Sequence, residues 1–374
     1  MFYSRASIHT PFSFKERFFS LDFTLLFSVL ILGVISIFAQ FSSSGGNFDY
    51  FAKSHAIRFG VFFIFFILIS FINVRFWNDY SLLIYASLVI LLILTKFFGV
   101  QSQGSRRWLN LFVFDLQPSE IMKIGIILFL SNYYHKISTN DVNKLKYLLF
   151  PLFAMTIPFL LVVTQPDLGT AILIFLSGAI ITWLAGVRWK IFAYLTGLLI
   201  ILAPIAISFL KPYQKSRILT FLNPDADPLG AGYQIIQSKI AVGSGGLTGK
   251  GFLNGSQAYL NYLPEKHTDF IFTLFSEEFG FMGSALIILL YATIIYRITR
   301  IGMLTRSIFA KLYCFGFASA FFVFVAVNMA MVLGLLPIVG APLPILSYGG
   351  SSMLAIMLGL GIVMSCNIYK NTTI

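Results

Sequence analysis

Charged residues are scarce in this sequence. Asp, Glu, Lys and Arg make up 11% of its 374 residues, whereas hydrophobic residues make up 58% and the mean hydropathy is +0.86. A soluble globular domain averages about 25% charged residues and about half apolar ones. The scarcity of charge therefore excludes an ordinary soluble domain and indicates an integral membrane protein.

Cysteine and histidine are scarce too. Cys314 and Cys366 both lie in apolar runs, which excludes a disulfide framework and a CxxC metal site. The four histidines are scattered and form no HExxH motif or paired ligand spacing. No small-residue cleavage site follows the first apolar run, so we expect a retained membrane span there rather than a removed signal peptide.

Long apolar runs dominate what remains. A helix needs about 20 apolar residues to cross the hydrocarbon core. The runs predict an all-α integral membrane protein with about ten transmembrane helices, folded as a single polytopic domain over residues 1–374. They occupy residues 23–41, 59–72, 80–95, 118–134, 147–164, 168–187, 191–209, 279–296, 311–335 and 348–368.

The distribution of Lys and Arg predicts the orientation. With the N-terminus inside, fourteen of these residues fall in inner segments and five in the short outer ones. Positive charge accumulates on the cytoplasmic side of membrane proteins. We therefore expect both termini in the cytoplasm. Most acidic residues lie on the opposite side, where we expect any chemistry.

One outer segment, residues 210–278, is too long to be a turn. Loops of that length are usually functional or internally structured, so we expect a large structured extracytoplasmic loop between the seventh and eighth helices. Apolar residues recur at helical spacing in 233–240, which predicts a helix lying at the membrane interface. A helix that covers the bundle and a helix that contacts substrate both fit this pattern.

Glu120 and Lys123 lie one helical turn apart near the outer end of the fourth run. Charges in hydrocarbon normally face a cavity or one another. A private ion pair and a pair that also lines a substrate site both fit. Arg106 and Arg107 lie just outside the membrane in RRW, where a guanidinium group can hold a phosphate or attract anionic lipid.

Two other polar interruptions have alternative explanations. Asp167 in QPDLGT is a candidate ligand for a cation or hydroxyl, or simply the cap of the helix that follows. The glycine-rich stretch 243–251 is not a P-loop, because GxxxxGK[ST] requires glycine where Ser244 stands and Ser or Thr where Gly251 stands. We interpret it as a flexible loop, and no other segment indicates a nucleotide site.

The segment 264–270, PEKHTDF, contains the side chains that look most suited to catalysis. Glu265, His267 and Asp269 alternate just before the eighth span, where partial desolvation raises the pKa of a carboxylate toward the range of a general base. An ordinary solvated loop explains the same residues. Residues 334–352 hold three prolines and four glycines between two spans, which predicts a site wall or a re-entrant turn.

Taken together, these segments resemble the SEDS family (shape, elongation, division, sporulation) of bacterial peptidoglycan polymerases. The matching segments are RRWL with QPSEIMK, QPDLGTA, NPDADPLGAGYQIIQSKIAVGSGGLTGKG, LPEKHTDFIF with SEEFG, and GLLPIVGAPLPILSYGGSS. They occur in family order over most of residues 104–365. The variant VGAPLP and the length of the chain resemble the elongation branch rather than the division branch.

The resemblance implies a peptidoglycan glycosyltransferase of the bacterial inner membrane that polymerises lipid II during cell elongation. It implies Asp269 as the catalytic carboxylate, the general base on the acceptor 4-hydroxyl. It also implies a class B penicillin-binding protein and the elongation machinery as partners, no nucleic acid, and possible use of a divalent cation (Mg or Mn) with metal ligands unknown. The substrate-binding residues that it implies are Arg107, Glu120, Lys123, Asp167, Lys239 and His267.

Two other functions remain open from the sequence. A lipid II flippase needs polar residues along a path from the inner face, whereas the inner halves of the predicted spans are almost wholly apolar. A non-catalytic scaffold that recruits wall-building proteins predicts that Asp269 can be replaced without loss. Polymerisation is the function that we predict.

Overall fold

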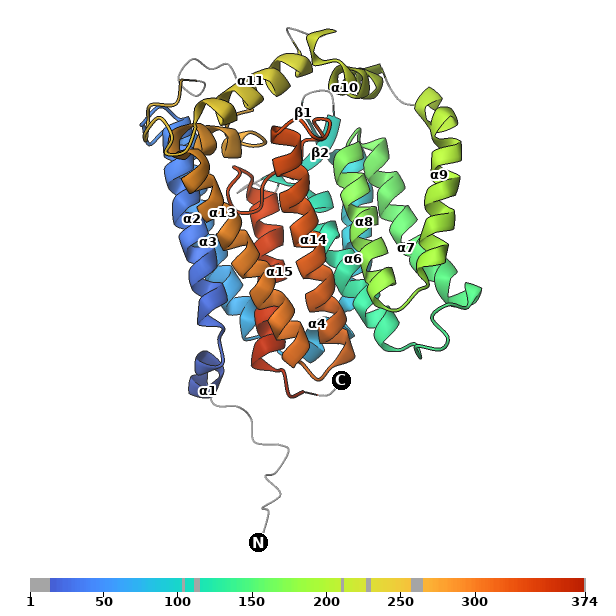
Figure 1. The fold of residues 1–374 in the computed structure, drawn as a ribbon. Helices are drawn as coiled ribbons and strands as arrows, with labels where there is room; N and C mark the ends of the chain where they lie inside the picture. The colour runs from blue at the N-terminus through green and yellow to red at the C-terminus, as the bar shows by residue number, and fades with distance from the viewer. Residues whose placement is uncertain are drawn as a thin grey trace.

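The computed structural model describes residues 14–102, 105–110, 115–209, 212–226, 230–256 and 265–372. These residues form a bundle of long helices, and one end of the bundle is covered by a helical arm and a short sheet (Figure 1). Pro264 and Gly104, both in motifs predicted to belong to the site, lie outside the described residues.

Each of the ten apolar runs is a helix. Side-chain caps begin several of them: Asp22 accepts from Leu25 N–H, and Asp49 accepts from Ala52 N–H. The ten helices are α2 (Phe23–Ser43), α3 (Tyr50–Ser70), α5 (Ser81–Phe98), α6 (Pro118–His135), α7 (Leu145–Thr164), α8 (Leu168–Leu184), α9 (Trp189–Phe209), α13 (Ile271–Leu304), α14 (Ile308–Val332) and α15 (Gly350–Ile368).

Seven of these helices are long and apolar enough to cross a membrane, namely α2, α3, α5, α7, α13, α14 and α15. The apolar helix α8 is shorter, and α6 carries the charges of Glu120 and Lys123. The all-α class and the multi-pass character are therefore confirmed, while the number of ten crossings stays a prediction. Large hydrophobic side chains remain exposed along the bundle, as lipid-facing positions require.

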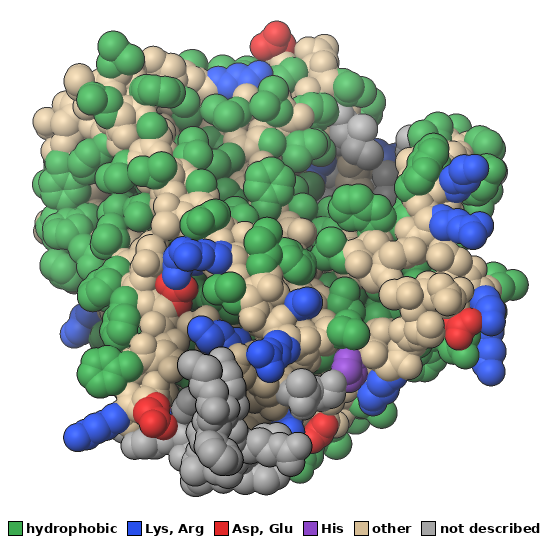
Figure 2. All heavy atoms as spheres, turned by 60° about the horizontal axis from the view of Figure 1, so that its bottom comes forward, with side chains coloured by type: hydrophobic (Ala, Val, Ile, Leu, Met, Phe, Trp, Pro, Cys, Tyr) green, Lys and Arg blue, Asp and Glu red, His purple; other side chains and the backbone are tan. Residues whose placement is uncertain are grey.

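Two short helices, α1 (Phe14–Phe19) and α4 (Val74–Asp79), lie at the same end of the bundle as the residues that follow α15 (Figure 1). There the carboxylate of Asp22 accepts two bonds of 3.1 and 3.0 Å from the Nε of Arg297, which ties α2 to α13. Lys and Arg side chains gather on this face (Figure 2). Exposed examples are Arg75, Lys136, Arg188, Lys190, Arg300, Arg306, Lys311 and Lys370.

The opposite end carries the irregular structure. Strands β1 (Val100–Ser102), β2 (Ser105–Asn110) and β3 (Asp115–Leu116) form an antiparallel sheet in that order. The arm consists of α10 (Pro212–Leu222), the short helix η1 (Pro224–Ala226) and α11 (Ala231–Ser244), which runs across the end of the bundle (Figure 1). The helix expected over 233–240 is confirmed as α11, whereas α10 and the sheet were not predicted.

The glycine-rich segment 243–251 is docked rather than flexible, which corrects the expectation from its composition. Helix α13 is kinked at Gly280, and the kink frees backbone groups that the loop binds. Phe281 N–H donates to Gly246 O at 2.9 Å, and Gly251 N–H donates to Glu278 O at 3.0 Å. The sequence pattern did not predict this contact, because the hydrogen bonds join the loop to a kink that is distant from it in the sequence.

Buried carboxylates lock the same contact. Glu277 is fully buried, and its Oε1 accepts from Lys250 Nζ at 2.6 Å and from the N–H and hydroxyl of Ser256. Glu278 accepts from the hydroxyl of Ser42 on α2. The SEEFG motif, residues 276–280, lies inside α13, which begins at Ile271 rather than near residue 279 as expected, and these contacts anchor the arm to the bundle.

Gly280→Ala is expected to loosen this anchor. Gly280 has φ 61° and ψ −157°, a conformation that side chains disfavour, and an added Cβ would lie 2.4 Å from Gly249 N. We expect a loss of about 1–3 kcal/mol, seen as a lower unfolding temperature in detergent. Gly60→Ala on α3, where a Cβ meets nothing within 4 Å, is the control and should not be destabilised. Equal unfolding temperatures for the two variants would contradict the prediction.

Candidate active site

The two irregular segments predicted to carry chemistry lie against each other at the arm-covered end. We call residues 265–270 the acidic turn and residues 333–349 the proline loop. Tyr348 N–H donates to His267 O at 2.9 Å, and the hydroxyl of Ser347 donates to Thr268 O at 2.6 Å. The expectation that the proline-rich segment forms part of a site wall therefore agrees with its position.

Asp269 is held at the centre of this contact, immediately before α13. Its carbonyl accepts from Asn328 Nδ2 at 3.0 Å, and a Cβ on Gly340 would lie 3.6 Å from its Oδ2. Gly340 has φ 71°, so a residue with a side chain is disfavoured at the position that faces the carboxylate. The Asp269 side chain is half-buried and thus keeps access to a ligand.

The surroundings of Asp269 raise its pKa from 3.8 to about 7. Burial is the largest cause, and the negative charges of Glu265, Asp167 and Glu120 add to it, while Arg217 acts in the opposite direction. A carboxyl group with a pKa near neutrality suits a general base better than an ordinary aspartate does. The raised pKa agrees with the desolvation expected from the sequence, and the catalytic role of Asp269 stays a prediction.

Arg217 was not predicted from the sequence. It lies on α10, and its Nη1 donates to Ile338 O of the proline loop at 3.1 Å. Its charge acts on Asp269, so the arm brings a cation to the acidic turn. In the sequence, Arg217 is only an arginine inside a long outer segment. The fold of the arm, which brings it to the acidic turn, could not be predicted from the sequence.

Glu120 and Lys123 form the predicted ion pair. Lys123 Nζ lies 2.8 Å from Glu120 Oε2, and both side chains are buried on α6. The ammonium group also lies 4.7 Å from the ring centre of Phe324 on α14. The pair connects α6 with α14, and the negative charge of Glu120 raises the pKa of Asp269. Contact of the pair with substrate stays a prediction.

Asp167 caps α8, as one alternative proposed, by accepting from Thr170 N–H at 3.2 Å. Its other oxygen accepts from Gln117 Nε2 at 3.2 Å and lies 3.8 Å from Nη1 of Arg107. Arg107 also donates to the carbonyl of Gln165 at 3.2 Å. Asp167 and Arg107 are thus brought together, and Asp167 contributes to the field at Asp269.

His267 is enclosed by the first two spans. Its Nδ1 lies 2.8 Å from the hydroxyl of Ser43, and its ring stacks on Phe51 at 4.3 Å. Burial, then the charge of Lys266, lowers the pKa of His267, so the ring is neutral at neutral pH. These contacts position the acidic turn, and the predicted role of His267 in binding substrate stays a prediction.

Lys239 lies on the arm and Arg106 lies on the sheet. Lys239 is exposed on α11 and packs over Gly334, since a Cβ there would lie 2.2 Å from its Cε. It therefore borders the start of the proline loop. Arg106 is exposed on β2. Both remain available to an anionic ligand, and binding by Lys239 stays a prediction.

A resident metal does not fit the site. Among the described residues, no three His, Cys, Asp or Glu side chains come together as an ion site. Glu120 is already paired with Lys123, and Asp167 accepts from Gln117 and lies beside the Arg107 guanidinium group. The expected divalent cation stays a prediction that would need phosphate oxygens from the substrate, as Mg²⁺ commonly does.

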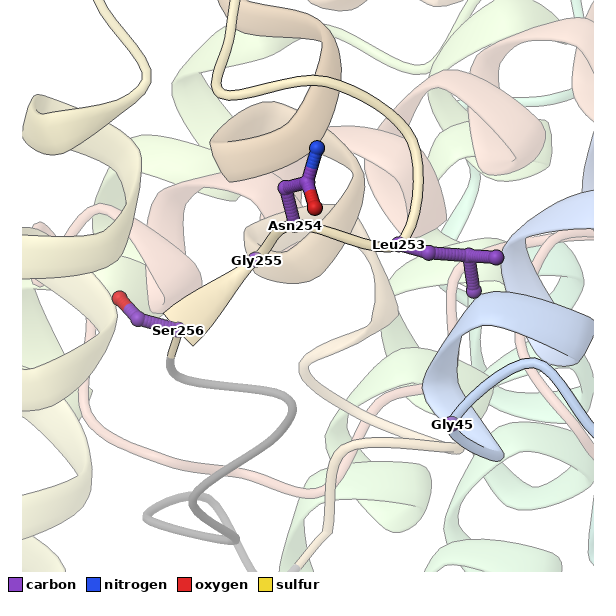
Figure 3. A pocket seen from close by; sticks show the side chains of 5 residues that line it. All are labelled: Gly45, Leu253, Asn254, Gly255 and Ser256. Atoms are coloured by element: carbon purple, nitrogen blue, oxygen red, sulfur yellow. The ribbon is translucent and has the colours of Figure 1, made fainter.

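One cavity, of about 520 Å³, lies apart from the acidic turn. It is formed where the segment that follows the glycine-rich loop faces the end of α2 (Figure 3). Its lining contains neither a charged side chain nor a predicted site residue, so we do not assign the chemistry to it. The lining residues are Gly45, Leu253, Asn254, Gly255 and Ser256.

Fold and site together define a polytopic helical membrane protein with a carboxylate-centred site at one end. Residues 18–372 match the cell cycle protein family of FtsW, RodA and SpoVE. The chain belongs to this family, which confirms the resemblance carried by its motifs.

Several relatives extend over nearly the whole chain. Peptidoglycan glycosyltransferase MrdB of Escherichia coli (strain K12) is 40% identical over 354 residues, which cover 94% of each chain. Stage V sporulation protein E of Bacillus subtilis (strain 168) is 34% identical over 358 residues, covering 93% of this chain and 97% of the relative.

Solved structures agree with the fold. A chain from a peptidoglycan synthase complex that coordinates polymerization and crosslinking has a TM-score of 0.80 and 28% identity, and the match covers 94% of this chain and 98% of that one. The rod shape determining protein RodA of Thermus thermophilus has a TM-score of 0.70 at 23% identity, with coverage of 94% and 98%, and supports the fold alone.

Asp269→Asn is expected to stabilise the protein at neutral and higher pH. Because the pKa of Asp269 is about 7 when folded and near 3.8 when unfolded, the folded state binds an extra proton between these values, and stability falls as pH rises through this window. Asparagine has no charge to bury. The rise in unfolding temperature over wild type should be larger at about pH 8 than at about pH 5.

Asp141→Asn is the control for this experiment. Asp141 forms an ion pair with Lys144 at the other end of the bundle, partly exposed to solvent. Its effect should be small and should not grow toward higher pH. An Asp269→Asn protein that is no more stable than wild type at either pH would contradict the buried charge.

Proposed function

We propose that this protein is a peptidoglycan glycosyltransferase that polymerises lipid II into glycan strands. The observation that carries the proposal is a half-buried aspartate, Asp269, whose pKa is about 7 and whose backbone is held by an immobilised turn. The similarity to MrdB, which is named a peptidoglycan glycosyltransferase, supports the same activity. Elongation of the cell is the process that we infer, as predicted from the motifs.

The chemistry follows from a single displacement. Asp269 takes the proton from the 4-hydroxyl of the acceptor sugar while that oxygen bonds to the anomeric carbon of lipid II. The bond from this carbon to the pyrophosphate breaks on the opposite face, and the pyrophosphate leaves with the electron pair. One displacement inverts the configuration, and the protonated carboxyl group then releases its proton to water.

Cations around the turn suit an anionic leaving group. Arg217 acts on Asp269 from α10, Arg107 lies beside Asp167, and Lys239 is exposed at the edge of the proline loop. Guanidinium groups bind phosphate oxygens through paired charge-assisted hydrogen bonds. We assign these three residues to the pyrophosphate, and Lys123 to an indirect role because Glu120 occupies it.

We infer that the acidic turn faces the outside of the bacterial inner membrane and that both termini are cytoplasmic. Support comes from the exposed Lys and Arg side chains at the end with α1 and α4 (Figure 2), since positive charge accumulates on the cytoplasmic side. We also propose a class B penicillin-binding protein as partner, because a similar chain is part of a complex of polymerization and crosslinking.

Asp269→Ala is expected to abolish polymerisation while the protein stays folded. Loss of a general base costs about 10²–10⁴-fold in rate. Purified wild type and variant are each given labelled lipid II together with the cognate transpeptidase, and glycan chains are separated by gel. Asp141→Ala, at the other end of the bundle, should retain wild-type activity.

The outcomes distinguish the rival functions. Equal polymer from wild type and Asp269→Ala would refute the general base and favour a scaffold. Polymer from neither protein would refute the glycosyltransferase and reopen the flippase, which a lipid II translocation assay in vesicles then tests.

Charges near the turn are expected to set the pH dependence of the rate. Glu265 raises the pKa of Asp269, so Glu265→Gln should lower this pKa and move the acidic limb of the kcat/KM profile to lower pH. Arg217 lowers the pKa, so Arg217→Gln should move the same limb to higher pH. Profiles that shift in the same direction for both variants would show that Asp269 does not control the limb.

A further inference from the structure

Two buried carboxamides connect the acidic turn to the proline loop in the same way. Gln40 on α2 donates through its Nε2 to His267 O at 2.9 Å and to Leu346 O at 3.3 Å. Asn328 on α14 donates through its Nδ2 to Asp269 O at 3.0 Å and to Ala341 O at 2.7 Å. Each amide group therefore uses both hydrogens to join one carbonyl of the turn to one of the loop.

The orientation of both amides is determined by their partners. Rotating either group by half a turn would place its oxygen against two carbonyl oxygens, which cannot donate. Both side chains are completely buried, so water does not compete for these bonds. The turn is thus held by hydrogen bonds from two helices, α2 and α14.

The bonds act on the backbone that carries the base. Carbonyls 267 and 269 are bound by the carboxamides, and the carbonyl between them, of Thr268, is bound by Ser347. Ala341 is the neighbour of Gly340, which faces the carboxylate of Asp269. Asn328 therefore sets the distance between the base and the wall in front of it.

Stability alone does not account for Asn328. Its Oδ1 is buried and has no hydrogen-bond partner among the described residues. A buried acceptor without a donor is unfavourable, so this side chain is a poor choice for packing. The two N–H groups of Asn328, which donate to the acidic turn and to the proline loop, therefore explain an asparagine at this position.

Resting on the glycosyltransferase function proposed above, we propose that Gln40 and Asn328 are positioning residues that form a carboxamide clamp on the catalytic turn. The clamp holds Asp269 at the reacting hydroxyl and does not itself contact substrate. Displacements of about 1 Å at a reacting group cost about 10²-fold in rate. Loss of the clamp therefore lowers kcat and has little effect on KM for lipid II.

The test uses Gln40→Met and Asn328→Leu, which keep size and remove the amide. Each variant, in complex with the cognate transpeptidase, is assayed for kcat and KM with lipid II. We expect kcat to fall at least about tenfold with KM within about threefold of wild type. The double variant should lose less than the product of the single losses, because both act on one turn.

Asn132→Leu is the matched control. Asn132 is a buried asparagine on α6 that bonds Asn78 on α4 at 2.9 Å, at the other end of the bundle. It should lower the unfolding temperature but leave kcat within about threefold of wild type. Asn328→Asp, which keeps the shape but has at most one O–H donor in place of the two N–H donors, replaces Asn328→Leu if that variant does not fold.

Specific outcomes would overturn the clamp. Wild-type kcat in both single variants would do so, and so would an equal loss of kcat in Asn132→Leu, because that would indicate general destabilisation. A rise in KM with unchanged kcat would show a substrate contact instead. Inactivity of the wild type itself would refute the proposed function, and Asp269→Ala marks the level of background activity.

Discussion

Where the backbone is not helical near the hydrocarbon core, its N–H and C=O groups need hydrogen-bond partners within the protein. The candidate site depends on how the acidic turn and the proline loop obtain these partners. The acidic turn precedes α13 and the proline loop connects α14 to α15, and both are irregular. Carbonyls 267, 268 and 269 are bound by Gln40, Ser347 and Asn328, so three successive residues have fixed positions. An immobilised turn is what allows a carboxylate to be held in a partly dehydrated place.

The same constraint explains the electrostatics. Asp269 loses hydration because the turn is held inward, and the acidic residues Glu265, Asp167 and Glu120 further disfavour its charge. Lys123, Gln117 and Arg107 neutralise or bind the last two, so the cluster stays tolerable in a low-dielectric setting. A base of this kind destabilises the folded state at neutral pH, and the many bonds to the turn offset that cost.

The arm is tied down by a second set of contacts. Gly280 kinks α13, the glycine-rich loop binds the exposed backbone, and Glu277 and Glu278 hold the segment that follows. This anchor places α10 and α11, and through them Arg217 and Lys239, over the proline loop. Cations for an anionic substrate thus reach the base from a part of the chain that is distant in sequence.

Apolar periodicity and length determined the ten helices and the membrane class by themselves, because lipid tolerates little else. Residue spacing also predicted the Glu120–Lys123 pair and the cap at Asp167, since these depend on neighbours within one helical turn, whereas Asp269 was implied by the resemblance to the family. In the sequence, Gln40 and Asn328 are isolated amide side chains within apolar runs, and Arg217 is one of several cations in the long outer segment. Only the tertiary structure could assign them, because their partners are backbone carbonyls, which any sequence offers, and four of the five lie 59 to 306 residues away.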